Sequence, residues 1–258
     1  LQIDIERLSD IVLTEPEKLY AETEINEISN AEYAIEVSNL QFKYSENDPL
    51  ILKNVSFKIP VNQSVAIIGP TGCGKTTLLH VLLGVFHQTE GEIKVMGQNL
   101  DTLGLNFVRD QIGTVLQDDI LFAGSIAENI CFFDSTPNLE WMNECAEIAA
   151  IHQDILKMPM GYQTLVGDIG NMLSGGQKQR ILLARALYKK PKILVMDEAI
   201  SHLDIQKEHE VNEKLKQLKI TKILIAHRPE TIASAERVIA LQDGVIVQDV
   251  LMKDIRPA

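Results

Sequence analysis

The stretch GPTGCGKTT, Gly69 to Thr77, decides the fold because of what stands on either side of it. The apolar run SVAII at 64–68 precedes it and is typical of a buried strand, whereas LLHVLLGVF at 78–86 follows it with the apolar content of a helix packed inside the molecule. A glycine-rich turn between such elements matches the spacing G-x-x-x-x-G-K-[ST]. The sequence therefore predicts a loop that binds the phosphates of a nucleoside triphosphate.

The chemistry of this loop assigns a role to each part of it. Glycines let backbone N–H groups wrap around the phosphates, and the helix N-terminus adds positive potential. Lys75 is expected to reach the β- and γ-phosphate oxygens, and the Thr76 hydroxyl to bind Mg²⁺. A turn that merely ends a strand is the alternative, and the flanking elements favour the phosphate site. The predicted nucleotide-binding residues are Gly69, Pro70, Thr71, Gly72, Cys73, Gly74, Lys75, Thr76 and Thr77.

Further apolar runs indicate the rest of the architecture. Alternating stretches at 34–44, 54–60 and 92–100 predict antiparallel strands, whereas continuous apolar runs at 112–117, 192–198 and 222–228 predict buried parallel strands. Helical patterns fill most of residues 118–187. The predicted fold class is α/β: a P-loop NTPase core with a mostly parallel sheet and flanking helices, an antiparallel β subdomain, and an inserted α-helical subdomain at about 118–187.

The first 34 residues differ from the remainder. Apolar positions at helical spacing up to Val12 precede an acidic, proline-containing stretch, which predicts a helix end followed by a linker. The nucleotide-binding domain is expected to occupy residues 35–258. Because the sequence begins with Leu1 and not with methionine, we expect a fragment of a longer chain.

Composition excludes some classes of function. Acidic residues outnumber basic ones by 36 to 24, which gives a net charge of −12. This charge has the wrong sign for gripping a nucleic-acid backbone, so no nucleic-acid partner is expected. The three cysteines, Cys73, Cys131 and Cys145, show no paired spacing, which indicates neither a disulfide framework nor a structural zinc site.

The run KILVMDE at 192–198 supplies two carboxylates at a strand end. Asp197 is placed to hold Mg²⁺, and Glu198 to orient or deprotonate the attacking water. A polar strand terminus is the alternative, which the nearby P-loop disfavours. General-base help is typically about 10²–10⁴-fold in rate, so Glu198 indicates nucleotide hydrolysis and not binding alone.

The run LSGGQ opens a strongly amphipathic helix and forms a second phosphate-binding helix N-terminus. A P-loop already fills the phosphate contacts in its own chain, so a second site indicates binding in trans. Read alone, Ser-Gly-Gly is more typical of a plain helix cap at a flexible turn than of a phosphate site. The predicted signature residues are Leu173, Ser174, Gly175, Gly176 and Gln177.

The order of these motifs resembles the nucleotide-binding domain of an ATP-binding cassette (ABC) transporter over about residues 35–248. The resemblance implies ATP and Mg²⁺ as ligands, with Gln117 of TVLQDD contacting the metal. It implies that His227 of ILIAHR is a catalytic residue at the γ-phosphate and that Tyr44 stacks on adenine. Without the resemblance, His227 is typical of a structural histidine and Tyr44 of a strand residue.

Some positions depart from the family pattern. The usual SALD appears as SHLD at 201–204, which retains Asp204 for dimer contacts but places His202 where a small residue is common. TLVGD at 164–168 stands where exporters carry an acidic TEVGE loop, with Leu165 replacing the first glutamate. Cys73 occupies a position that is more often serine, and we predict that alkylating it inhibits the enzyme unless Mg·ATP protects it.

The exporter branch is favoured by the TLVGD segment and by GSIAENI at 124–130, and the upstream ERLSDIVLTEPE resembles the junction in peptidase-containing bacteriocin exporters of the colicin V type. The resemblance implies an ATPase motor for peptide export at the cytoplasmic face of the bacterial inner membrane. Its implied partners are a transmembrane domain and a second nucleotide-binding domain, head to tail. A nucleic-acid-linked ABC ATPase and a non-hydrolysing nucleotide switch remain as alternatives.

Overall fold

The computed structural model describes residues 12–13, 31–103, 105–166, 173–197 and 205–255. Its largest sheet has six strands, and each neighbouring pair is parallel except the pair at one edge, β12 and β11. In spatial order the strands are β12 (Val245–Leu251), β11 (Arg237–Gln242), β3 (Ser64–Ile68), β10 (Thr221–Ile225), β9 (Ile193–Asp197) and β6 (Ile112–Val115). The four strands predicted from continuous apolar runs are therefore confirmed as parallel neighbours.

The hairpin of β11 and β12 was not predicted, although the sequence carries a signal for it. Asp243 and Gly244 link the two strands with backbone φ angles of 50° and 79°. An Asp-Gly pair flanked by apolar residues is a strong hairpin signal, because both central positions of the favoured tight turn require positive φ. This hairpin matters for the site, since β11 lies beside β3, the strand that leads into the P-loop.

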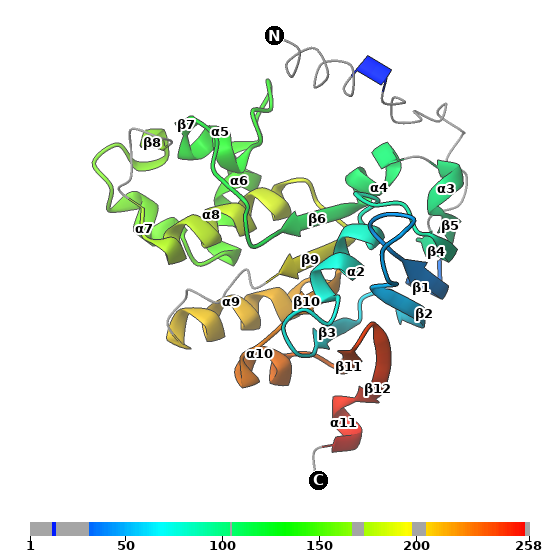
Figure 1. Ribbon diagram of the computed structural model, residues 1–258. Coiled ribbons are helices and arrows are strands. Elements are labelled where there is room, and N and C mark those ends of the chain that lie inside the picture. The colour runs from blue at the N-terminus through cyan, green and yellow to red at the C-terminus, as the bar shows by residue number, and fades with distance from the viewer. Residues whose placement is uncertain (1–11, 14–30, 104, 167–172, 198–204, 256–258) are drawn as a thin grey trace.

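A second sheet is antiparallel, as predicted. Its spatial order is β2 (Leu52–Pro60), β1 (Tyr33–Phe42), β4 (Glu90–Val95) and β5 (Gln98–Asn99). One face of β1 and β2 alternates into the core, as the period-two pattern requires. Figure 1 shows these strands on one side of the molecule, opposite the group of helices from α5 (Ile126–Ile130) to α8 (Gly175–Tyr188).

The central strands separate two hydrophobic cores. Ile193 and Val195 of β9 lie in the core shared with the antiparallel sheet and with α2 (Lys75–Leu82). Leu194 and Met196 lie in the core shared with α8 and α9 (Ile205–Gln217). Successive side chains of a strand point to opposite faces, so a continuous apolar run covers both cores at once. This is why β9 and β10 are buried along their whole length.

The inserted helical part is confirmed, with two local differences. Its helices are α5 (Ile126–Ile130), α6 (Leu139–Ile148), α7 (His152–Leu156) and α8 (Gly175–Tyr188), with a 3₁₀ turn at Gly161–Gln163. A short antiparallel pair, β7 (Gly124–Ser125) with β8 (Leu165–Val166), also lies within it. The helical pattern of residues 138–158 is divided between α6 and α7, because Ala150 adopts a φ of 54° that no α-helix accommodates.

The helix after the P-loop is shorter than its apolar pattern predicts. It ends at Leu82, Gly84 adopts a φ of 68°, and Val85 is 60% exposed instead of packed inside. A glycine in the left-handed region just after the last turn is a common helix stop, and it ended α2 before Val85 could reach the core. The remaining helices are α3 (Leu100–Leu103), α4 (Leu105–Gln111), α9 (Ile205–Gln217), α10 (Pro229–Ser234) and α11 (Met252–Ile255).

The predicted N-terminal helix and linker fall almost wholly outside the described residues. Val12 and Leu13 are helical and exposed. Among the helices that the structure describes, none combines the length and the apolar composition that crossing a bilayer would require.

Candidate functional site

The P-loop connects the end of β3 to the start of α2 and has little room at its base. A Cβ atom on Gly69 would meet the carbonyl oxygen of Leu241 in β11 at 2.1 Å, so a side chain there is excluded. Gly74 caps the N-terminus of α2 with a φ of 104°, a conformation that glycine adopts without strain. The strand β11, which was not predicted, thus packs against the base of the loop. The backbone N–H groups at the start of α2 remain available to an anion.

Lys75 lies at the first position of α2 and is 6% exposed. Its ammonium group donates to the carbonyl oxygens of Gly69 and Pro70, at 2.9 Å each, and lies 3.9 Å from the Cys73 Sγ. The cation is therefore folded back over the loop that should hold the phosphates. Thr71 and Gly72, at the crest of the same loop, are exposed. This arrangement brings a fixed positive charge and a set of backbone donors to one place.

Thr76 and Asp197, predicted from separate motifs, are in direct contact. The Thr76 hydroxyl donates to Asp197 Oδ2 at 3.1 Å, and Asp197 is 2% exposed. The contact follows from the sheet: Asp197, the last residue of β9, pairs with Ile225 of β10, and Ile225 pairs with Ile67 of β3. A hydroxyl and a carboxylate are the oxygen ligands that Mg²⁺ prefers, so this pair fits the predicted metal site.

Tyr44 lies beside the P-loop helix. Its hydroxyl is 2.9 Å from the Thr77 Oγ1, and the side chain is 57% exposed. Phe42 and Phe86 hold the ring edge-on at centroid distances of 5.0 and 5.5 Å, which leaves it an exposed surface. A supported aromatic ring next to the phosphate loop suits stacking on a purine base. These two phenylalanines were not predicted. The signal for Phe42 was its place at the end of β1, two residues before Tyr44, and the signal for Phe86 was its place just after α2.

Gln117 and His227 lie at the same edge of the sheet as Asp197. Gln117 comes two residues after the end of β6 and His227 two residues after the end of β10, and both are exposed. Because β6, β9 and β10 are parallel neighbours, the residues that follow them emerge at one edge. Ligands of open α/β sheets bind at this carboxyl edge.

The signature turn is built as a helix cap on α8. Ser174 accepts a hydrogen bond from the Gln177 backbone N–H at 3.2 Å, and the Gln177 side chain accepts from the Ser174 N–H at 2.9 Å. Ser174 and Gly175 are exposed, whereas Leu173 packs against the second core. Since the P-loop helix belongs to the first core, the two predicted phosphate sites are anchored in different parts of the molecule.

Some predicted site residues lie outside the described residues. These are Glu198 and Asp204. His202, which departs from the family pattern, and the end of the TLVGD segment at 167–168 also lie outside them. Within that segment, Leu165 is 65% exposed and Thr164 is buried.

A model of the ABC transporter family matches residues 52–201, a span that holds the P-loop, the capped turn of α8 and the strand ending at Asp197. The chain belongs to the ABC transporter family. Two proteins of Escherichia coli are each 45% identical to it over 236 residues: the microcin secretion/processing ATP-binding protein MchF and the colicin V secretion/processing ATP-binding protein CvaB.

The comparison with solved structures agrees with this family. The structure of a bacterial Atm1-family ABC exporter with ATP bound superposes with a TM-score of 0.86 at 32% identity, covering 98% of this chain and 45% of that one. The two secretion proteins are likewise matched over 92% of this chain and 34% of their own length. This ABC chain thus spans about a third of the curated relatives it matches, and its fold is that of an exporter's ATP-binding part.

Alkylation of the ABC chain with iodoacetamide tests the unusual Cys73. Cys73 is 7% exposed and its Sγ lies close to Gly69, so we expect slow modification, loss of ATP binding once it occurs, and protection by Mg·ATP, which would cover the loop. Cys145 serves as the internal control. Burial raises the pKa of its thiol to about 12, so only about one thiol in 10⁴ is ionised at pH 8. Cys145 should therefore stay unreactive until the pH approaches 12. Peptide mass mapping with an ATP-binding assay gives both results, and full ATP binding after complete modification of Cys73 would contradict the prediction.

Proposed function

We propose that this chain is the ATP-hydrolysing motor of an ABC exporter, working as a head-to-tail dimer at the cytoplasmic face of a bacterial inner membrane. In this proposal residues 1–34 link the motor to a transmembrane domain, and residues 35–258 form the motor. Binding of ATP drives closure of two copies, and hydrolysis with product release reopens them. The observation that carries the proposal is the presence of two glycine-rich turns that each open a helix, at Lys75 and Ser174, anchored in different cores.

The residues around the P-loop have complementary roles in this mechanism. The loop from Gly69 to Thr77 and the Lys75 ammonium bind the ATP phosphates, and the ring of Tyr44 stacks on the base. Thr76, Asp197 and Gln117 would hold Mg²⁺, which would neutralise charge on the phosphates. The contact of Thr76 with Asp197 supports this assignment because it brings two oxygen ligands to the end of the loop.

Hydrolysis requires an activated water in line with the γ-phosphate. Glu198, which directly follows Asp197, is the proposed base, and His227 is the proposed second catalytic residue at the γ-phosphate. The second copy would complete the site with its signature residues 173–177 and with Asp204. Hydrogen-bond donors lower the barrier only when they are correctly placed. A single copy would lack the donors of the second copy's signature turn, so its site would stay open on one side.

The exported cargo is proposed to be a peptide, such as a bacteriocin. Support comes from the two Escherichia coli relatives, which are described as microcin and colicin V secretion/processing proteins. The exposed Leu165, in the segment that would face the membrane domain, would give that contact an apolar character where other exporters use a charge. The net charge of −12 continues to argue against a nucleic-acid-linked ATPase.

The dependence of turnover on protein concentration tests the motor. If two copies share each ATP, specific ATPase activity of the chain should rise with its concentration and level off once dimers predominate, in the micromolar range or above. In a complete transporter, tethering would supply an effective concentration of order mM. The measurement is phosphate release across a dilution series, with sedimentation on the same samples. Constant specific activity in samples that stay monomeric with Mg·ATP would refute the shared site, and no hydrolysis at any concentration would favour the nucleotide switch.

A further inference from the structure

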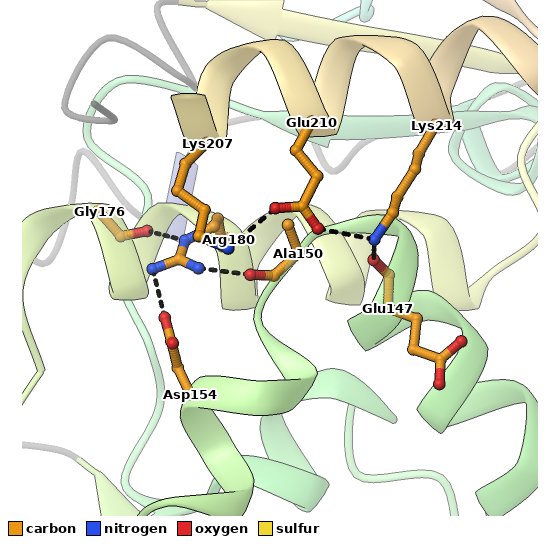
Figure 2. Close-up of polar contacts among 8 residues, drawn as sticks. All are labelled: Glu147, Ala150, Asp154, Gly176, Arg180, Lys207, Glu210 and Lys214. Carbon is orange, nitrogen blue, oxygen red and sulfur yellow. Dashed lines mark hydrogen bonds and ion pairs between the residues drawn. The ribbon is translucent and has the colours of Figure 1, made fainter. Parts of the chain in front are cut away.

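A buried arginine follows the signature turn by one helical turn and joins it to a distant part of the fold. Arg180, 6% exposed, donates from Nε to the Gly176 carbonyl oxygen at 3.2 Å. Its two terminal nitrogens contact the Ala150 carbonyl oxygen and the carboxylate of Asp154, the latter at 2.7 Å. Figure 2 shows these three partners around one guanidinium group. One side chain thus connects the first turn of α8 with the corner between α6 and α7.

The shape of the guanidinium group explains why this position uses arginine. Its donors lie in a planar fork and point in different directions, so one group reaches three acceptors on two segments. A lysine has a single terminal nitrogen at the end of a flexible stem and would lose part of this set. Because the Arg180 side chain is buried, any partner that it loses is not replaced by bulk water.

The corner itself is a fixed point of the helical part. Ala150 leaves the helical conformation between α6 and α7, and Asp154 lies in the first turn of α7. A carboxylate in a first helical turn is stabilised by the helix dipole as well as by its ion pair. Ile151 is fully buried, which anchors the corner in the second core.

A second contact reaches the same corner from α9. Lys214 donates to the Glu147 carbonyl oxygen at 2.7 Å and to Glu210 Oε1 at 3.0 Å, and Lys207 bonds the other oxygen of Glu210 at 2.8 Å (Figure 2). These side chains are more than a third exposed, so their ion pairs contribute little. The corner is therefore held firmly by Arg180 and weakly by Lys214, and Lys214 offers a matched control.

We propose that Arg180, paired with Asp154, is a positioning residue that sets the phosphate-binding N-terminus of α8 for the ATP of a second copy. This inference rests on the proposed function. Ser174 and Gly175 are exposed and belong to a glycine-rich turn, which by itself has little rigidity. The bond from Arg180 to Gly176 ties that turn to the corner. A displacement of about 1 Å in a group that positions the substrate costs up to about 100-fold in rate. Holding the signature turn in place therefore matters for turnover.

The P-loop and the signature turn respond differently to loss of this pair. Arg180→Gln should leave ATP affinity of the monomer within about twofold, because the P-loop helix is anchored in the other core. ATP-driven dimerisation, measured by sedimentation in a Glu198→Gln background, should weaken about tenfold, and kcat at a fixed protein concentration should fall with it. Asp154→Asn, which keeps the shape of the side chain, should weaken dimerisation and lower kcat by a smaller factor. Lys214→Met should match the parent chain.

Mixing two impaired variants separates positioning from general damage. In a head-to-tail dimer, Arg180→Gln impairs the signature half and Lys75→Ala the P-loop half, so mixing them rebuilds one intact site. We expect the mixture to hydrolyse ATP faster than the sum of the two variants measured alone, because only the mixed dimer contains a site without a substitution. Lys75→Ala mixed with the double variant Arg180→Gln/Lys75→Ala contains no intact P-loop and should stay inactive.

Each outcome of these assays is decisive. Wild-type-like dimerisation of Arg180→Gln and Asp154→Asn, or an equal loss of monomer ATP affinity, would overturn the positioning role while leaving the motor intact. Failure of the Arg180→Gln and Lys75→Ala mixture, with both variants folded by circular dichroism, would overturn it as well. Failure of the proposed function is recognised separately, because the wild-type chain itself would then show no concentration-dependent hydrolysis.

Discussion

Glu198→Gln is expected to reduce ATP turnover by about 10²–10⁴-fold while ATP binding remains, and to accumulate ATP-bound dimers. Glutamine keeps the size of the side chain and loses its ability to take a proton from the attacking water. In the sequence, Glu198 directly follows Asp197, the last residue of a strand that is buried along its length. Single-turnover phosphate release measures the loss of hydrolysis, and a separate titration measures whether ATP binding remains.

Glu213→Gln is the matched control for this variant. Glu213 lies on α9, its side chain is half exposed, and it pairs with Lys216. That ion pair lowers the pKa of Glu213, so the control also removes a charged carboxylate at pH 7, and it should leave turnover unchanged. Hydrolysis at the parent rate in Glu198→Gln would remove Glu198 from its proposed role.

Lys75→Met is expected to abolish ATPase activity and to weaken ATP binding by at least about 100-fold. The Lys75 ammonium is buried and held by Gly69 and Pro70 at the site where the phosphates should bind. Methionine keeps the length and apolar stem of the side chain but removes the charge-assisted bonds, each of which contributes about 1.5–3 kcal/mol. Calorimetric titration with Mg·ATP gives the affinity.

Lys58→Met is the control for the loss of one positive charge. Lys58 lies on the antiparallel sheet and pairs with Glu36, with its own side chain 54% exposed. The thermal midpoint of both variants should remain near that of the parent chain, which separates lost binding from lost folding. Parent-like ATP affinity in Lys75→Met would show that the loop binds phosphate through its backbone alone.

Much of the site could be predicted from the sequence because its signals are local. The P-loop is a strand, a turn and a helix in one continuous stretch, and the capping box of α8 joins Ser174 to Gln177, three residues away. The strand ending at Asp197 was visible as an apolar run with a carboxylate at its end. Interactions of this kind depend on residues within one or two turns, so their pattern is readable before the chain folds.

Prediction was weaker where backbone conformation at a single residue decided the outcome. Gly84 ended α2 earlier than its apolar pattern indicated, and Ala150 divided a predicted helix in two. The hairpin of β11 and β12 was missed although the Asp243-Gly244 turn marks it. In each case the regular spacing of apolar residues continued past a residue whose φ is positive. The spacing alone does not show where φ becomes positive.

The sequence by itself determined the nucleotide site, the order of the motifs and the class of fold, because each rests on a contiguous pattern. Only the tertiary structure decided which of these patterns meet: Thr76 contacts Asp197 across 121 positions, and Arg180 contacts Ala150 across 30. Such contacts depend on how parallel strands are ordered in the sheet and how helices pack on it. No local periodicity encodes that order, since it is fixed by burial of both faces of the central strands at once.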